Sequence, residues 1–248
     1  MPTFENCVVT IDGNDLFATN ASISIQNNRG DVKGYGSQGS AGQVAEGRIK
    51  GSLTASYLLR GNDPIRNLTG LSLDKIVNAN IGPFRCYSGV LTSYSLSIEP
   101  YSPVTCEVKM DFYNGYDQGG STSTMDPTGE FLHGGATTVS TDLLWSSDII
   151  GCTYTLNQAI TPRYLLGELV PYAYKRDNGT ISVSLKGPDL GKVLTSPCEG
   201  YTEGTLNLTG LCTPINDEIP FSGFVVNPSI NISANQEIIG SLEVFSTF

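Results

Sequence analysis

The chain has little positive charge and almost no histidine. Fourteen Lys and Arg residues stand against twenty-four Asp and Glu residues, which gives a formal charge of −10 at pH 7. Nucleic-acid binding surfaces gain affinity by neutralising phosphates with cations, so this balance argues against a protein that reads DNA or RNA. The single histidine, His133, lies in the Gly- and Thr-rich stretch FLHGGATT, where we expect an exposed loop.

Catalytic and metal-binding signatures are missing as well. No cysteine pair has C-x-x-C spacing, and six cysteines with one histidine do not form a standard zinc motif. The chain also lacks a nucleophile elbow, a Walker loop and an H-E-x-x-H motif, and no specific pattern marks a carboxylate pair of the glycosidase type. We therefore expect a protein that is not an enzyme, with no catalytic residue, cofactor site or metal site.

Long apolar runs are also absent. No segment approaches the run of about 18 apolar residues that a membrane-spanning helix needs. The start, MPTFENCVVTIDGND, has neither the basic beginning nor the apolar block of a secretory signal. We therefore expect an intracellular protein without membrane contact, whose six cysteines are reduced thiols.

The sequence does contain strict alternation of apolar and polar residues over short runs, which is the period of a strand with one buried face. These runs predict an all-β fold, and two segments predict one short helix in each half, LSLDKIVNA (Leu71–Ala79) and PDLGKVLT (Pro188–Thr195). The alternating runs are Ser22–Ile25, Gly47–Leu58, Ser93–Ile98, Cys106–Tyr113, Thr153–Leu156, Thr180–Leu185, Thr205–Leu211, Ser229–Ser233 and Ser241–Phe245.

The alternating runs recur in the same order in the two halves of the chain. Ile23 aligns with Tyr154 at a shift of 131 residues, and GRIKGSL aligns with GTISVSL at a shift of 132. YSGVLTSYSLSIEPYSPVTCEVKM then aligns with FSGFVVNPSINISANQEIIGSLEV at a shift of 134. We interpret this order as an internal duplication of a β-sandwich or barrel domain. The domains are residues 1–117 and 142–248, and a Gly/Ser/Thr-rich linker or loop, residues 118–141, joins them.

One identity does not fit this alignment. The pentapeptide NLTGL occurs at Asn67 and again at Asn207, a shift of 140. We interpret it as a coincidence.

Each half also has a long segment between two strands, which we expect to form a β-hairpin arm. In the first arm, GYGSQG matches the G-x-G-x-x-G pattern of dinucleotide sites but lacks the flanking strand and helix, and RGD fits a polar turn. Near the N-terminus, IDGND (Ile11–Asp15) fits a turn between two strands better than a calcium loop, because it lacks the regularly spaced oxygen ligands.

The order of strand, arm, GxIxxSL strand, short helix, PFxxGxV strand, SxSI strand and final strand resembles the tube domain of tailed-bacteriophage tails and related contractile injection machines. The closest likeness is in Ile160–Leu185 (ITPRYLLGELVPYAYKRDNGTISVSL), where a T-P-x-Y-x-L-G element precedes a G-x-I-x-V strand. The first arm departs from this pattern, with NRGD in place of TPRY.

The resemblance implies a virion structural protein that polymerises as stacked rings into the tail tube, a passive conduit for DNA ejection. Duplicated members of the family form trimers with pseudo-hexameric rings, so the resemblance implies a homotrimer. It also implies contacts with sheath or terminator, baseplate and tape-measure proteins, and a lumen through which DNA passes without specific binding. The place of action would be the virion tail, after assembly in the host cytoplasm.

Two sets of residues follow as site predictions. Alternation places Glu107, Asp111 and Glu243 opposite the apolar face, and we expect these acids to help line a net negative lumen. We expect the arms to contact other subunits or rings through Asp31, Gly34, Tyr35, Gly36, Pro162, Tyr164, Leu165, Leu166, Leu169 and Tyr172.

Two alternatives stay open. A baseplate hub, distal-tail or neck protein with the same duplicated domain would form one ring in place of a stack. A secreted adhesin or carbohydrate-binding β-sandwich is an alternative of another class, supported by five N-x-S/T sequons and the RGD tripeptide.

Overall fold

The computed structural model describes residues 8–26, 29–32, 42–45, 50–68, 76–119, 130–141, 149–168, 170–188, 200–210, 216–231 and 239–248. Within these stretches, nearly all of the regular structure is β-strand, and one 3₁₀ helix (η1, Pro64–Leu68) is present. The all-β class expected from the alternating runs is therefore confirmed. The strands are β1 (Val9–Ile11), β2 (Asn14–Gln26), β3 (Arg29–Val32), β4 (Gly42–Ala45), β5 (Lys50–Leu58), β6 (Val77–Ile81), β7 (Phe84–Ile98), β8 (Thr105–Phe112), β9 (Tyr116–Asp117), β10 (Thr138–Thr141), β11 (Gly151–Arg163), β12 (Ala173–Gly187), β13 (Tyr201–Thr209), β14 (Asn216–Asn231) and β15 (Ile239–Thr247).

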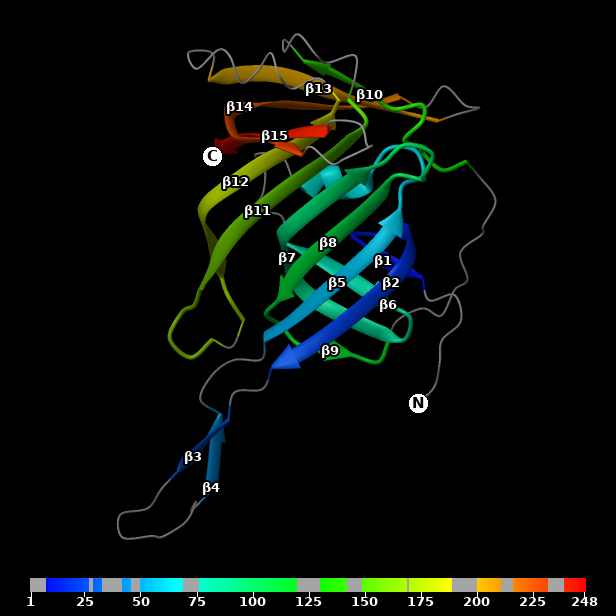
Figure 1. Ribbon diagram of the computed structural model, residues 1–248. Coiled ribbons are helices and arrows are strands. Elements are labelled where there is room, and N and C mark those ends of the chain that lie inside the picture. Colours follow the sequence, from blue (N-terminus) through cyan, green and yellow to red (C-terminus); the bar gives the residue numbers. More distant parts are fainter. Residues whose placement is uncertain are drawn as a thin grey trace.

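Six strands of the first half form a closed antiparallel barrel (Figure 1). Pairing runs β1–β2–β5–β8–β7–β6 and returns to β1. Successive side chains of a strand point to opposite faces, so every second residue enters the core. Leu53 of β5 and Val108 and Met110 of β8 are completely buried there.

A two-residue turn fixes the start of this barrel. Asp12 and Gly13 both have positive φ, at 51° and 79°, and they join Ile11 directly to its partner Asn14. Two positive φ values are the mark of a tight hairpin turn, for which Asp-Gly is a preferred sequence. The turn predicted in IDGND is confirmed.

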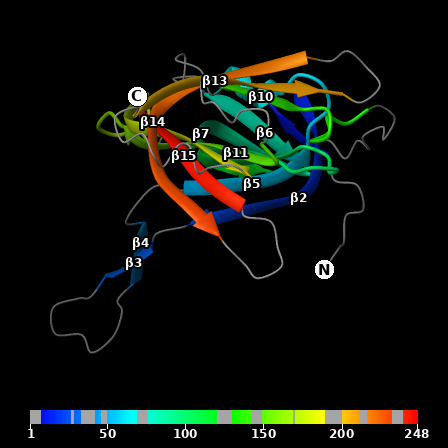
Figure 2. The same cartoon turned by 45° about the horizontal axis from the view of Figure 1, so that its top comes forward.

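The second half extends the sheet outward from the barrel. β11 pairs with β7 along Ser93–Ile98, next to the part of β7 that pairs with β6. β12, β15, β14, β13 and β10 then follow, each antiparallel to its neighbour (Figures 1 and 2). Eight strands, β2–β5–β8–β7–β11–β12–β15–β14, therefore form one continuous antiparallel sheet.

The order of pairing is alike in the two halves. In the first half it runs β1–β6–β7–β8–β5–β2, and in the second it runs β10–β13–β14–β15–β12–β11. The halves differ at closure, because β1 pairs with β2, whereas β10 and β11 have no pairing with each other within the residues described.

The expected helix at Leu71–Ala79 is wrong in its described part. Val77 begins strand β6, in which Val77 and Ala79 are buried and Asn78 is exposed. The two-residue period of VNANI therefore determines the structure, rather than the weaker helical spacing before it. Of the second candidate, Pro188–Thr195, all residues after Pro188 lie outside the described part.

The repeated pentapeptide NLTGL has two different structures. Asn67 belongs to the 3₁₀ helix η1, whereas Asn207 belongs to strand β13 and pairs with Thr138. The two copies therefore do not occupy matching places in the halves, as expected of a coincidence.

Part of the expected linker packs against the first barrel. The Leu132 side chain is completely buried, its backbone N–H donates to the carbonyl oxygen of Leu59, and its carbonyl oxygen accepts from the backbone N–H of Val104. β10 follows and pairs with β13. The described residues 130–141 therefore carry the chain across the end of the barrel and into the second set of strands.

A buried carboxylate lies at the same end of the core. Asp63 is 4% exposed and accepts hydrogen bonds from the Tyr57 hydroxyl at 2.8 and 2.9 Å, the Tyr94 hydroxyl at 2.6 Å and the Ile65 backbone N–H at 2.9 Å. Asp63 thus caps the first turn of η1, a place that favours Asp followed by Pro. Burial raises the pKa of Asp63, while these hydrogen bonds act in the opposite direction.

We expect Asp63→Ala to lower the free energy of unfolding by about 2–4 kcal/mol, since it leaves two buried hydroxyls and one N–H without their acceptor. Denaturant unfolding monitored by tyrosine fluorescence would measure the change. Asp63→Asn, which keeps one acceptor oxygen, should lose less. Glu107→Ala, at an exposed acid on β8, serves as the control and should change stability by no more than about 0.5 kcal/mol. Equal stability of Asp63→Ala and wild type would contradict a supporting role for the cluster.

Candidate assembly surfaces

The eight-stranded sheet has a hydroxyl-rich face directed away from the core. Along β7, Tyr94 and Leu96 are buried, while the alternating residues Ser93, Ser95 and Ser97 are partly exposed. The same alternation holds on the neighbouring strands, so their outward positions meet across the pairs, as Ser95 does with Thr155 and Thr155 with Ser182. The outward hydroxyl residues of β5, β7, β11 and β12 include Ser52, Thr54, Ser56, Ser93, Ser95, Ser97, Thr153, Thr155, Ser182 and Ser184.

The three acids predicted from alternation all lie on this hydroxyl-rich face. Glu107 is exposed on β8, and Asp111 on the same strand forms an ion pair with Lys50 at 2.8 Å. Glu243 on β15 is partly exposed and accepts a hydrogen bond from the Asn227 side chain at 3.2 Å. The structure therefore brings these acids onto one surface, although it separates them onto two strands.

The charge of this face is balanced rather than strongly acidic. Lys50, Lys109 and Lys186 share it with the three acids. Sequence patterning could have found these lysines, since each occupies an outward position of its strand. On β5, β8, β12 and β15 the face therefore has small hydroxyl groups and three charges of each sign, while Glu218 on β14 adds one exposed acid.

The second arm is the end of the β11–β12 hairpin, which projects from the sheet at the lower left of Figure 1. Its base is held against the first half of the chain. The Tyr174 ring contacts the Tyr113 ring with centroids 5.5 Å apart, and its hydroxyl donates to the carbonyl oxygen of Ser88 at 3.3 Å. No local sequence pattern predicts this anchor, because Ser88, Tyr113 and Tyr174 lie far apart in the chain.

The tip of this arm presents large apolar side chains to solvent. Leu165 is 55% exposed, Leu166 is fully exposed and Tyr172 is 56% exposed. A hydrogen bond from the backbone N–H of Tyr172 to the carbonyl oxygen of Arg163 closes the hairpin behind them. Of the other predicted residues, Pro162 and Tyr164 are partly buried, and Leu169 lies outside the described residues.

The first arm is described only in part. β3 and β4, which lie between β2 and β5 in the chain, pair with each other as a separate two-stranded ribbon. Asp31 lies opposite Gln43. This pairing agrees with the expected hairpin. Gly34, Tyr35 and Gly36 lie outside the described residues.

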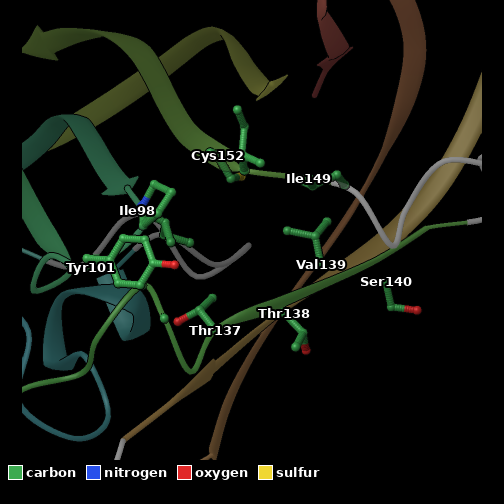
Figure 3. A pocket seen from close by; sticks show the side chains of 13 residues that line it. Ile98, Tyr101, Thr137, Thr138, Val139, Ser140, Ile149 and Cys152 are labelled. Carbon is green, nitrogen blue, oxygen red and sulfur yellow. The ribbon is translucent and has the colours of Figure 1, made fainter. Parts of the chain in front are cut away.

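A pocket of about 490 Å³ lies where β10 passes the start of β11 and the end of β7 (Figure 3). Ile98, Tyr101, Val139 and Cys152 line it, and none of its described lining residues is charged. Burial raises the pKa of the Cys152 thiol to about 12, which keeps it protonated and poorly nucleophilic at neutral pH. The pocket offers apolar and hydroxyl contacts but no set of groups for acid–base or nucleophilic chemistry.

The described part of the chain has no cluster of three His, Cys, Asp or Glu side chains that could hold a metal ion, and no helix there has the length and apolarity needed to cross a membrane. Cys86, Cys106 and Cys152 are buried free thiols, as expected for reduced cysteines.

Replacing both exposed leucines, Leu165→Ser with Leu166→Ser, tests whether the arm tip makes contacts between subunits. We expect the concentration needed for self-assembly to rise at least about tenfold, because burial of a leucine side chain contributes about 1.5–3 kcal/mol. Sedimentation of a concentration series would measure this. Thermal stability of the unassembled protein should not change, and Tyr101→Ser, at an exposed residue outside the arm, is the matched control. Assembly at the wild-type concentration would remove the arm tip from the contact.

Comparison with known proteins adds no relative. No protein-family model matches the chain, and no curated protein matches it in sequence. A function for this chain has therefore to be inferred from its own strand pairing, edges and surfaces.

Proposed function

We propose that this protein is a virion structural protein of a tailed bacteriophage, which assembles as stacked rings into the tail tube and conducts DNA passively during ejection. One observation carries the proposal. A strand-pairing pattern occurs twice in the chain, and the two copies are joined edge to edge in a single sheet through β7 and β11. In a ring of similar domains, such a chain would supply two neighbouring domains.

The pairing registers support an origin of the two halves by duplication. A shift of 134 residues carries the pair Val90↔Asp111 onto Phe224↔Phe245. The same shift carries Ser95↔Glu107 onto Ser229↔Ser241. Both strand pairs also contain an irregularity in register, and the two places differ by one residue in this alignment: after Leu91, which maps to Val225, in one pair, and after Val226 in the other. Bulges tend to be inherited with a fold, so a shared bulge favours common descent.

The remaining strands follow the same relation. Shifts of 131 in β2 and 130 in β5 carry the pair Ile23↔Leu53 onto Tyr154↔Val183. The sequence alignment used a shift of 132 at β5, which matched Leu53 with Leu185. The strand pairing instead matches Leu53 with Val183. A difference of two residues keeps the same face inward, so the alternation could not reveal it.

Ring assembly in this proposal uses the two end strands of the eight-stranded sheet, β2 and β14, where their outer edges have no strand partner among the described residues. Unpaired strand edges promote uncontrolled association in a monomer, and closure into a ring removes them. With four strands of this sheet from each half, three chains would place six similar units around one channel. This is the homotrimer of the proposal.

The hydroxyl-rich face is suited to the wall of that channel. Serine and threonine hydroxyls keep a surface hydrated without a strong charge, and the three lysines balance Glu107, Asp111 and Glu243. A wall with a surplus of cations would hold the phosphate backbone, and DNA would stall. In this proposal a neutral, hydrated wall, rather than a strongly negative one, allows DNA to slide, and no catalytic group is required.

Negative-stain microscopy of the purified protein, together with native mass spectrometry, tests the proposal. We expect long hollow tubes whose smallest closed unit contains three chains. Single rings that never stack would favour the hub, distal-tail or neck alternative. Rings of six chains would contradict the paired-domain arrangement. A protein that stays monomeric at all concentrations would overturn the structural role and favour an adhesin.

A further inference from the structure

The contact between β7 and β11 is a strand seam within one chain. Ser93–Ile98 pairs antiparallel with Cys152–Asn157, residue by residue, with Leu96 opposite Tyr154. The Tyr94 and Tyr154 rings are in edge contact, with centroids 6.2 Å apart. The inward residues of this seam are all nearly inaccessible to solvent: Tyr94 1%, Leu96 0%, Ile98 6%, Cys152 3%, Tyr154 6% and Leu156 1% exposed.

The corresponding strands at the two ends of the sheet are exposed. The shift of 134 carries Leu96 onto Ile230 of β14, and the shift of 131 carries Leu156 onto Ile25 of β2. Ile230 is 38% exposed and Ile25 is 37% exposed. Positions that are buried at the β7–β11 contact are therefore partly exposed at the equivalent places on β14 and β2, the two end strands of the eight-stranded sheet.

Each of these exposed segments also has one edge without a strand partner among the described residues. β2 pairs with β5 from Phe17 to Gln26, but its other edge pairs with β1 only up to Leu16. β14 pairs with β15 along its last residues, but its pairs with β13 end at Phe224. Figure 1 places β14 in the upper part of the view and β2 in the lower part, so the two edges do not meet within one molecule.

We propose that β2 of one copy and β14 of the next form a second seam with the same geometry as the β7–β11 seam. The partner is a second copy of this chain, joined head to tail, and the inference rests on the ring assembly proposed above. Applying both shifts to the β7–β11 register places Ile23 opposite Ile230 and Ser24 opposite Ser229. The seam runs antiparallel and joins Ser22–Gln26 to 227–231 of the neighbour.

The chemistry of both segments suits such pairing. The sequences SISIQ and NPSIN contain no charged residue, although charged side chains are a common means of protecting an exposed edge from another strand. Pairing would bury Ile23, Ile25 and Ile230 and satisfy the free backbone groups of both edges. Pro228 has no backbone N–H to donate, a property that strands tolerate at an edge, so this seam has one donor fewer than the internal one.

A cysteine pair tests the register directly. Ser24→Cys and Ser229→Cys in one chain occupy positions equivalent to the paired Thr155 and Ser95, which point outward and do not enter the core. Directly opposed residues lie within the Cα distance that a disulfide can span. After mild oxidation, non-reducing electrophoresis should show linked species up to the closed ring. A mixture of the two single variants should yield linked dimers only.

Three controls separate the seam from other contacts. Wild type and each single variant alone account for disulfides formed by the native cysteines. The pair Ser22→Cys with Ser229→Cys moves one thiol two residues along the strand, about 7 Å, which is too far for a disulfide. Efficient linkage of this shifted pair would overturn the proposed register.

The outcomes also distinguish the seam from the proposed function. Tubes or rings without linkage between positions 24 and 229 would reject the seam and leave the tube role standing, whereas monomers in every condition would reject both. Ile230→Lys gives an independent measure, because it should shift sedimentation from assemblies to the single chain while the thermal unfolding midpoint is unchanged. Tyr101→Lys, at a more exposed residue away from both edges, should assemble as wild type does.

Discussion

The architecture depends on one edge of strand β7. This strand is 15 residues long, and β8 occupies one of its edges. The other edge is divided, since β6 takes the beginning of the strand and completes the barrel, and β11 takes Ser93–Ile98 and begins the second half. If another strand covered this edge of β7 along Ser93–Ile98, the barrel would have no place to attach β11 and the strands that follow it. The length of one strand therefore joins the closed unit to the extended sheet.

The two faces of the extended sheet differ in their role in stability and in their tolerance of substitutions. The inner face consists of close-packed apolar side chains, with Leu53, Val108, Leu96 and Val183 completely buried, and it fixes the register of every strand. The outer face has small hydroxyl residues and balanced charges. Substitutions on this outer face change stability little. Its composition can therefore be determined by other requirements, such as hydration of a channel or avoidance of nonspecific binding.

The sequence predicted the local part of this fold well and the distant part poorly. CEVKMDFY, TISVSL and TLNLTGL each overlap the strand that their alternation predicts, and the Asp12–Gly13 turn follows from its dipeptide alone. β10 was missed because it is short and lies in a Gly- and Thr-rich stretch that resembles a linker. The helix expected at Leu71–Ala79 is wrong from Val77 onward because Val77 fits both a helical period and the two-residue period that it shares with Ala79 and Ile81. Barrel closure, the Asp63 cluster and the Tyr174 anchor join residues far apart in the chain, and no local pattern encodes such contacts.

The position of the closed barrel has a consequence for how the chain reaches its folded state. All six barrel strands lie before residue 113, so the ribosome releases a complete core before most of the second half exists. Domains fold as units during synthesis, the N-terminal one first. The finished barrel then offers the free part of the β7 edge as a template, and β11 is the first long strand of the second half to emerge. Order of synthesis and order of pairing coincide for β11 and β12, whereas β13 and β14 are made before β15, the strand through which they join the sheet.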